Sequence, residues 1–239
     1  PKADHCNVQY RRKACNNCGP CDIGCTRGAK SSADVTYWPK ALNKGVVLKT
    51  NARVNEITIG KDGLVDGVTY FDSDGNIHKQ RTKCVVMACN GIGTPRLLLN
   101  STSNLFPDGL ANSSGQVGRN LMFHPLAKLT GVFDEFLGGY KGPVANVIAS
   151  HEFYETDMSR GFLRGYSLYP ERSSGPLYTA LGGIGGHVIP WGPDHHRVFS
   201  ERFGHTAVMT ACGEDLPEEH NRIVLDPTLK DSNGIPAPK

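Results

Sequence analysis

The sequence predicts a mixed α/β (α+β) fold, and three stretches carry that prediction. Residues 85–89 form a short, continuous apolar run, which is typical of a strand buried on both faces. Residues 53–83 contain three strand-like stretches separated by Asp-Gly turns, which is the pattern of an antiparallel meander. From residue 126 onward, strand-like stretches predominate and helices are few, which favours a second, antiparallel sheet.

The apolar run leads into a tight turn and a helix. Asn90, Gly91 and Gly93 turn the chain, Thr94 is a natural N-cap, and Pro95 suits the first helical position. Free backbone N–H groups and the positive end of a helix dipole would then meet at the turn. Such a point suits a cofactor's phosphate, carbonyl or electron-rich ring edge, although many α/β domains have this turn without a ligand.

The other expected elements follow from periodicity and turn residues. One helix is capped by Ser31 or Ser32 and ends near Gly45, and another is capped by Asp194 and runs to Phe203. Strands are expected at residues 46–50, 53–59, 64–71, 77–83, 126–133, 144–150, 161–169, 205–212 and 222–225.

The length and composition of the chain limit the number of domains and the kinds of partner that it can have. The chain has 239 residues and a mass of 25.9 kDa, enough for one or two domains. Its 26 Lys and Arg against 23 Asp and Glu give a net charge of +3, and no basic run indicates a nucleic-acid surface. No apolar stretch is long enough for a transmembrane helix.

The two ends of the sequence lack the usual markers of a chain's ends. The sequence given starts at Pro1 with no initiator Met and no apolar signal core, and its last residues carry no cap or tail. We therefore expect an internal fragment of a longer protein. The compartment stays open between periplasm and cytoplasm, because a signal would lie upstream of Pro1.

Five of the eight cysteines lie in the first 25 positions, within a loop-like stretch at residues 1–30. The spacing Cys15-x2-Cys18-x2-Cys21-x3-Cys25 resembles a run that ligates iron–sulfur clusters, although Thr26 stands where Pro usually follows. These four cysteines are therefore candidate metal ligands. Structural thiols, disulfides or a zinc site are the alternatives.

Four blocks of the sequence carry a family resemblance. They are Cys-Gly-Pro-Cys-Asp-Ile-Gly-Cys-Thr-Arg-Gly-Ala-Lys-Ser-Ser at 18–32, Asn-Gly-Ile-Gly-Thr-Pro-Arg-Leu-Leu-Leu-Asn-Ser at 90–101, Val-Gly-Arg-Asn-Leu-Met-Phe-His-Pro at 117–125, and 221–238. In this order they resemble the middle of a glucose–methanol–choline (GMC) oxidoreductase, nearest the gluconate and sugar dehydrogenase flavoprotein subunits. The second block departs from the family signature at Asn90 and Thr102.

The resemblance implies the cofactor FAD and a set of residues beside it. Thr50-x-Ala52-x-Val54 and the stretch from Ala88 to Gly91 are similar to motifs that border FAD in two-dinucleotide-binding flavoproteins. Residues 1–125, with their Cys-rich loop at 1–30, would be part of a Rossmann-like FAD-binding domain with a β-meander. Residues 126–239 would be part of an antiparallel-sheet substrate domain. The implied cofactor-binding residues are Val54, Ala88, Asn90, Gly91, Thr94 and Pro95.

The implied activity is oxidation of a CH–OH group of an alcohol, sugar or sugar acid. Hydride passes to the flavin, and a separate acceptor such as cytochrome c or a quinone takes the electrons; oxygen is the alternative acceptor. The family's Gly-x-Gly-x-x-Gly loop is absent from the sequence, and its catalytic His lies beyond this stretch, so no catalytic residue is assigned. An iron–sulfur or metal-binding electron-transfer module and a non-catalytic fragment are the other hypotheses.

Overall fold

The computed structural model describes residues 12–19, 21, 24–142, 148–172, 175–181 and 189–239. The chain forms two compact units, each assembled from two separate segments. The first unit comprises Pro1–Val47 and His124–Asp215, and the second unit comprises Leu48–Phe123 and Leu216–Lys239. The segments thus interleave along the chain, whereas the sequence interpretation divided it once after residue 125. The assignment of FAD-binding and substrate domains to 1–125 and 126–239 stays a prediction.

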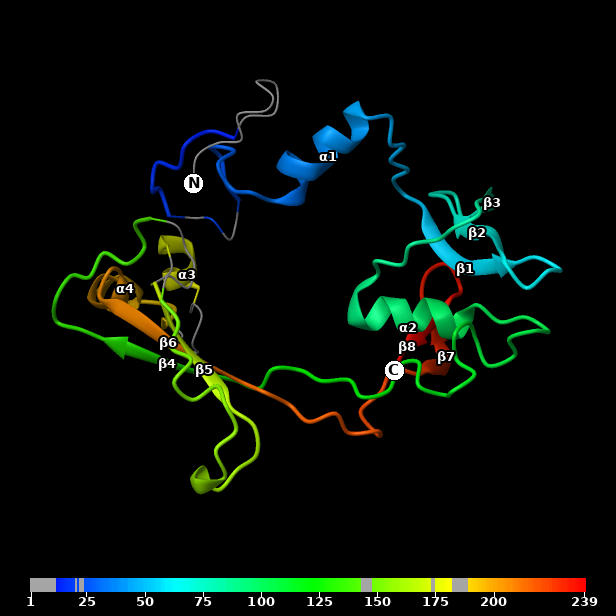
Figure 1. Cartoon of the computed structure of the whole chain (residues 1–239). Coiled ribbons are helices and arrows are strands. Elements are labelled where there is room, and N and C mark those ends of the chain that lie inside the picture. The colour runs from blue at the N-terminus through cyan, green and yellow to red at the C-terminus, as the bar shows by residue number, and fades with distance from the viewer. Residues whose placement is uncertain (1–11, 20, 22–23, 143–147, 173–174, 182–188) are drawn as a thin grey trace. The chain divides into compact units, whose positions relative to one another are not determined.

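The second unit contains the predicted meander. Strands β1 (Arg53–Ile59), β2 (Val65–Phe71) and β3 (Ile77–Arg81) pair antiparallel in the order β1-β2-β3 (Figure 1). The Asp-Gly turns form as expected, and at the second one the Asp72 carboxylate accepts the N–H groups of Asp74 and Asn76 at 2.9 Å each.

Helix α2 (Asn90–Asn100) packs against β1 and against a two-stranded sheet of β7 (Leu225–Lys230) and β8 (Pro236–Pro238) (Figure 1). The buried side chains of this unit lie in β1, in β2 and in the loops that adjoin α2, β7 and β8, and none of them lies within α2, β7 or β8 itself. They are Ile57, Tyr70, Ser101, Leu110, Ile223 and Ile235.

Two predicted strands, at 46–50 and at 85–89, are wrong. Residues 85–89 form no regular structure and pair with none of the described strands, and Val86 is 86% exposed rather than buried. Residues 46–50 are likewise irregular. An apolar run becomes a strand only where a neighbour completes its ladder of hydrogen bonds, and the described residues provide no such neighbour. The buried strand expected at 85–89 is therefore absent from the described part of the chain.

The first unit contains a second antiparallel sheet, of order β4-β6-β5. Its strands are β4 (Leu126–Val132), β5 (Tyr166–Glu171) and β6 (Thr206–Gly213). They confirm the strands expected at 126–133 and 205–212, whereas the strand expected at 161–169 starts five residues later and ends two residues later. The strand expected at 144–150 lies mostly outside the described residues, although Ser150 bridges to Leu168. The mixed α+β class is confirmed.

The helices of the first unit are short, and they lie in the segments before or between the strands of this sheet. They are α1 (Ala33–Asn43), the 3-10 helix η2 (Met158–Arg160), α3 (Pro176–Ala180) and α4 (His195–Arg202). Ser32 and Asp194 are the N-cap residues of α1 and α4, as predicted, although neither makes a side-chain capping bond. No helix of the described residues is long and apolar enough to cross a membrane.

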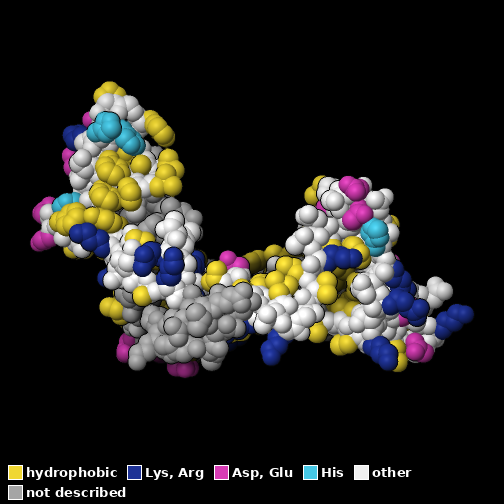
Figure 2. Space-filling view, turned by 90° about the horizontal axis from the view of Figure 1, so that it is seen from above, with side chains coloured by type: hydrophobic (Ala, Val, Ile, Leu, Met, Phe, Trp, Pro, Cys, Tyr) yellow, Lys and Arg dark blue, Asp and Glu magenta, His cyan; other side chains and the backbone are white. Residues whose placement is uncertain are grey.

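The β4-β6-β5 sheet has one face of apolar side chains. Strand pairing sets Leu129 opposite Met209 and Met209 opposite Pro170, with alanines at neighbouring positions of the same face. Leu129 is 74% exposed. Figure 2 shows hydrophobic side chains gathered at the surface of both units.

Candidate functional site

The start of α2 differs from its prediction in a way that matters for the site. The helix begins at Asn90, four residues before the predicted cap Thr94, and Pro95 lies inside it. Asn90 has a positive φ of 62°, and its Oδ1 accepts the N–H groups of Ile92 (2.9 Å) and Gly93 (3.1 Å). Asn90 thus does the capping that we expected of Thr94, because an Asn tolerates this conformation and reaches its own next N–H groups.

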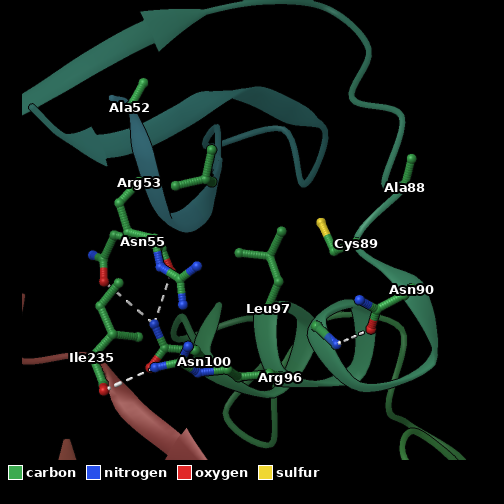
Figure 3. Close-up of a pocket in the computed structure, with 12 residues that line it drawn as sticks. Ala52, Arg53, Asn55, Ala88, Cys89, Asn90, Arg96, Leu97, Asn100 and Ile235 are labelled. Carbon is green, nitrogen blue, oxygen red and sulfur yellow. Dashed lines mark hydrogen bonds between the residues drawn. The ribbon is translucent and has the colours of Figure 1, made fainter. Parts of the chain in front are cut away.

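A first cleft of about 410 Å³ lies between β1, α2 and the turn that joins β7 to β8 (Figure 3). Among the described residues that line it, arginines are the charged side chains and no carboxylate is present. Three predicted cofactor residues, Val54, Ala88 and Asn90, are among them. The lining consists of Ala52, Arg53, Val54, Asn55, Ala88, Cys89, Asn90, Gly93, Arg96, Leu97, Asn100 and Ile235.

A second cleft of about 360 Å³ is formed by α2 and the loop at residues 117–122. The other three predicted residues, Gly91, Thr94 and Pro95, line this cleft together with Leu98. Residues 90, 93, 97 and 100 line the first cleft and residues 91, 94, 95 and 98 the second. At about 100° per residue these two sets lie on two different faces of one helix. The beginning of α2 therefore separates the two clefts.

The loop of the second cleft is held by close backbone contacts. Gly118 has a φ of +83°, and a Cβ on it would lie 2.3 Å from the carbonyl oxygen of Ile223. The N–H of Ile223 donates to the Gly118 carbonyl at 2.8 Å, and the N–H of Leu121 donates to Asn221 at 2.7 Å. Only glycine fits both this backbone conformation and this approach.

Arg96 fastens α2 to the β7–β8 turn. Its guanidinium donates to the carbonyls of Pro236 (2.6 Å) and Ile235 (3.0 Å) and to Oδ2 of Asp231 (2.9 Å), and its side chain is 11% exposed. Partial burial acts to raise the pKa of Asp231, but hydrogen bonds from Arg96 and from the N–H groups of Ile235 and Asn233 outweigh it, so that the pKa lies below its ordinary value.

The other end of α2 is joined to the free edge of β1. The Ser101 hydroxyl accepts the N–H of Ile57 (2.9 Å) and donates to the carbonyl of Leu97 (2.7 Å). Asn100 donates to the carbonyl of Asn55 at 2.8 Å. These side chains satisfy backbone groups of β1 that point away from β2, which fixes the distance between β1 and α2 across the first cleft.

A family model described as GMC oxidoreductase matches residues 3–126, more than half of the chain. The chain belongs to the GMC oxidoreductase family. Members of this family bind FAD, and the helix that separates the two clefts carries the second of the resemblance blocks recognised in the sequence.

Individual relatives agree with this assignment. The chain is 46% identical over 90% of its length to 2-methyl-1,2-propanediol dehydrogenase of Mycolicibacterium austroafricanum and covers 39% of that protein. It is 29% identical over 94% of its length to the fructose dehydrogenase large subunit of Gluconobacter japonicus, covering 40% of it. It is also 29% identical over 74% of its length to paromamine 6'-oxidase of Streptomyces fradiae, covering 34%. The chain thus spans about two fifths of the length of the first two relatives.

The four candidate metal ligands lie in the first unit, in a stretch without regular structure. Cys15, Cys18, Cys21 and Cys25 are free thiols, and the described residues contain no group of three or more His, Cys, Asp or Glu placed to hold a metal ion. The N–H of Ala29 donates to the Cys25 sulfur at 3.3 Å, and this bond, followed by one from Lys30, lowers the pKa of that thiol. The structure does not bring the four thiols together, and their role as ligands stays a prediction.

Sequence reasoning missed the charged cluster beside the first cleft. Arg53, Arg96 and Asp231 come from β1, α2 and the β7–β8 turn, and the pairing of Arg96 with Asp231 spans 135 positions. The one available signal was that Arg96 and Asp231 each belong to a block of the family resemblance.

Proposed function

We propose that this chain forms part of the FAD-binding region of an oxidoreductase that oxidises a CH–OH group of an alcohol, sugar or sugar acid. The observation that carries the proposal is the distribution of the six implied cofactor residues over two clefts on either side of the first turns of α2. Membership of an FAD-binding family gives this distribution its interpretation.

The residues that line the clefts fit a flavin dinucleotide. A Cβ added to Gly91 would meet nothing within 4 Å, so the helix begins with open backbone where a bulky ligand can approach. Each cleft has an arginine in its lining and, among its described residues, no carboxylate that would repel a phosphate. Apolar side chains such as Val54 and Leu97 offer surfaces for a ring system.

FAD, when bound, supplies the acceptor for the hydride removed from the substrate. The chain's own residues bind and orient it. In this proposal Val54 and Ala88 border the cofactor on the side of the first cleft, and Gly91, Thr94 and Pro95 border it on the other. Asn90 keeps the first turn of α2 in shape, and Arg96 keeps the helix against the β7–β8 turn. No residue of this chain is given the role of catalytic base.

The substrate class and the acceptor follow the relatives' names and the family resemblance. By their names, two relatives are dehydrogenases of 2-methyl-1,2-propanediol and of fructose, and one is an oxidase of paromamine. We propose a small alcohol or sugar as substrate and a separate electron acceptor, a cytochrome c or a quinone. In the same proposal, residues 1–125 serve the cofactor and residues 126–239 the substrate, except that the β7–β8 part at Leu216–Lys239 adjoins the cofactor cleft.

The test is the flavin content of the purified protein that contains this chain, measured after heat denaturation. We expect about one FAD per chain in the wild type. Gly91→Val would place a branched side chain in open space at the helix start, so we expect a folded protein that has lost most of its flavin. Gly175→Val is the matched control, because Gly175 is also in open space but lies in the first unit, and it should keep its flavin.

Wild-type protein that is folded and free of flavin would overturn the proposal. If flavin is present, anaerobic mixing with a panel of alcohols and sugars then identifies the compounds that reduce it. Reoxidation by a cytochrome or quinone analogue rather than by oxygen is the expected result, and fast reoxidation by oxygen would make the protein an oxidase instead.

A further inference from the structure

Two guanidinium groups share one carboxylate oxygen beside the first cleft. Oδ2 of Asp231 accepts from Nη2 of Arg96 at 2.9 Å and from Nη2 of Arg53 at 3.3 Å. Arg96 has two further backbone acceptors and is 11% exposed, whereas Arg53 is 54% exposed. Arg96 is therefore a fixed part of the cleft wall, and Arg53 is held loosely.

The charges around this carboxylate do not balance. Two positive groups face one negative group, and both arginines line the first cleft, whose described lining holds no carboxylate. The cleft therefore has a surplus of positive charge that favours an anionic ligand. Figure 3 shows Arg53 on the β1 side, across the cleft from Cys89 and Asn90 at the start of α2, so positive potential is present on both sides of the opening.

Release of Arg53 from Asp231 costs little. An exposed ion pair contributes little to stability, because water screens it and two side chains lose freedom in forming it. An arginine bound to a phosphate makes charge-assisted, often bidentate hydrogen bonds, which are stronger. Asp231 keeps its partner Arg96 and the N–H groups of Asn233 and Ile235 when Arg53 leaves.

We propose that Arg53 binds a phosphate group of the nucleotide in the first cleft, exchanging its hydrogen bond to Asp231 for bonds to phosphate oxygens, while Arg96 stays on Asp231. This inference rests on the proposed function, since it takes the ligand to be a dinucleotide cofactor. It names the chemical class that the charged side of the cleft recognises, a nucleoside diphosphate.

The experiment measures the affinity of flavin-free protein, prepared from the purified holoprotein, for ADP and for adenosine by calorimetry. We expect Arg53→Gln to weaken ADP binding about tenfold and adenosine binding less than twofold, since only ADP offers phosphate oxygens. Arg53→Lys, which keeps the charge but not the fork of donors, should give an intermediate loss. Arg81→Gln is the control, because Arg81 is an exposed arginine on β3 that lines neither cleft.

Three results would overturn the inference. One is an Arg53→Gln protein whose ADP affinity equals that of the wild type, and another is an equal loss for ADP and adenosine, which would place Arg53 at the base or sugar. The third is an equal loss of ADP affinity in Arg81→Gln, which would mean that the effect comes from the net charge of the protein and not from a contact of Arg53 with phosphate. In each of these the wild type still contains flavin and only the role of Arg53 fails, whereas a wild type that contains no flavin and binds no ADP removes the proposed function as well.

Discussion

The α2 region of the second unit and the cysteine loop of the first unit both carry residues that the sequence marked for cofactors. Around α2, the marked residues line two defined clefts, and polar side chains such as Arg96 and Ser101 tie the helix to elements far away in sequence. In the cysteine loop, the contacts of the marked thiols are short-range, as between Cys25 and Ala29, and no metal-binding group forms in the described residues. The two regions therefore differ in how the marked side chains are held: by contacts between distant segments around α2, and by contacts within the loop at Cys25.

The cofactor content of the purified protein is the most direct test of this difference between the α2 region and the cysteine loop. We expect the purified protein to contain FAD but less than one iron per chain, because the described thiols do not gather into a ligand set. The measurement is iron, acid-labile sulfide and flavin in the wild type and in Cys21→Ser, with Cys84→Ser as a control from outside the loop. Iron that is present in the wild type and lost in Cys21→Ser alone, with flavin retained, would contradict this and support the four-cysteine ligand set.

The next largest effect is expected at Arg96. Arg96→Met removes three hydrogen bonds and leaves Asp231 partly buried without its main partner, so we expect a loss of about 3 kcal/mol in the free energy of unfolding, measured by urea denaturation. Arg53→Gln, which removes the exposed partner of the same carboxylate, should cost less than about 1 kcal/mol. Equal losses in the two variants would show that Arg96 contributes no more to stability than the exposed Arg53 does.

A substitution at Gly118 tests whether the close backbone contact of the loop that lines the second cleft matters for stability. Gly118→Ala puts a Cβ 2.3 Å from the Ile223 carbonyl at a positive φ, so we expect a loss of about 2–3 kcal/mol and weaker flavin binding, because the loop that lines the cleft must shift. Gly115→Ala is a matched control, since Gly115 also has a positive φ but open space around it, and about 1 kcal/mol is expected. The same cost at both positions would mean that the close approach at Gly118 is unimportant.

A substitution at Ser101 tests how much its hydrogen bonds between α2 and β1 contribute to stability. Ser101→Ala leaves the buried N–H of Ile57 without its acceptor, for which we expect a loss of about 1–2 kcal/mol in thermal or urea unfolding. Ser73→Ala, at an exposed turn position, should be within about 0.5 kcal/mol of the wild type. A neutral Ser101→Ala would indicate that water or a shifted side chain replaces the hydroxyl.

The smallest effect is a pH dependence at the β2–β3 turn. A hydrogen bond from His78, followed by the N–H of Asn76, lowers the pKa of Asp72 from 3.8 to about 2. A carboxyl whose pKa is lower in the folded state stabilises the fold above pH 3.8 and loses that contribution as the pH falls toward 2. We therefore expect the wild type to unfold at a higher temperature than Asp72→Asn near pH 6, with the difference gone by about pH 2. A difference independent of pH would contradict this cause.

Part of the fold and of the candidate site could be predicted from neighbours along the chain. The meander followed from alternating residues and Asp-Gly turns, and the helix after the glycine-rich turn followed from Asn90 to Leu99. The strand at 85–89 could not be predicted correctly, because its apolar run describes the side chains and not the presence of a pairing strand. The helix start was misplaced because Asn90 competes with Thr94 as a cap, and only its backbone conformation decides between them.

The sequence by itself determined the α+β class, the family and the six residues expected beside the cofactor. Only the tertiary structure decided that these residues divide between two sides of α2, and that Arg53 and Arg96 meet at Asp231. The reason is physical: turns, caps and strand alternation depend on residues within a few positions of one another. A charge cluster that joins positions 53, 96 and 231 depends instead on how packed elements bring distant segments together.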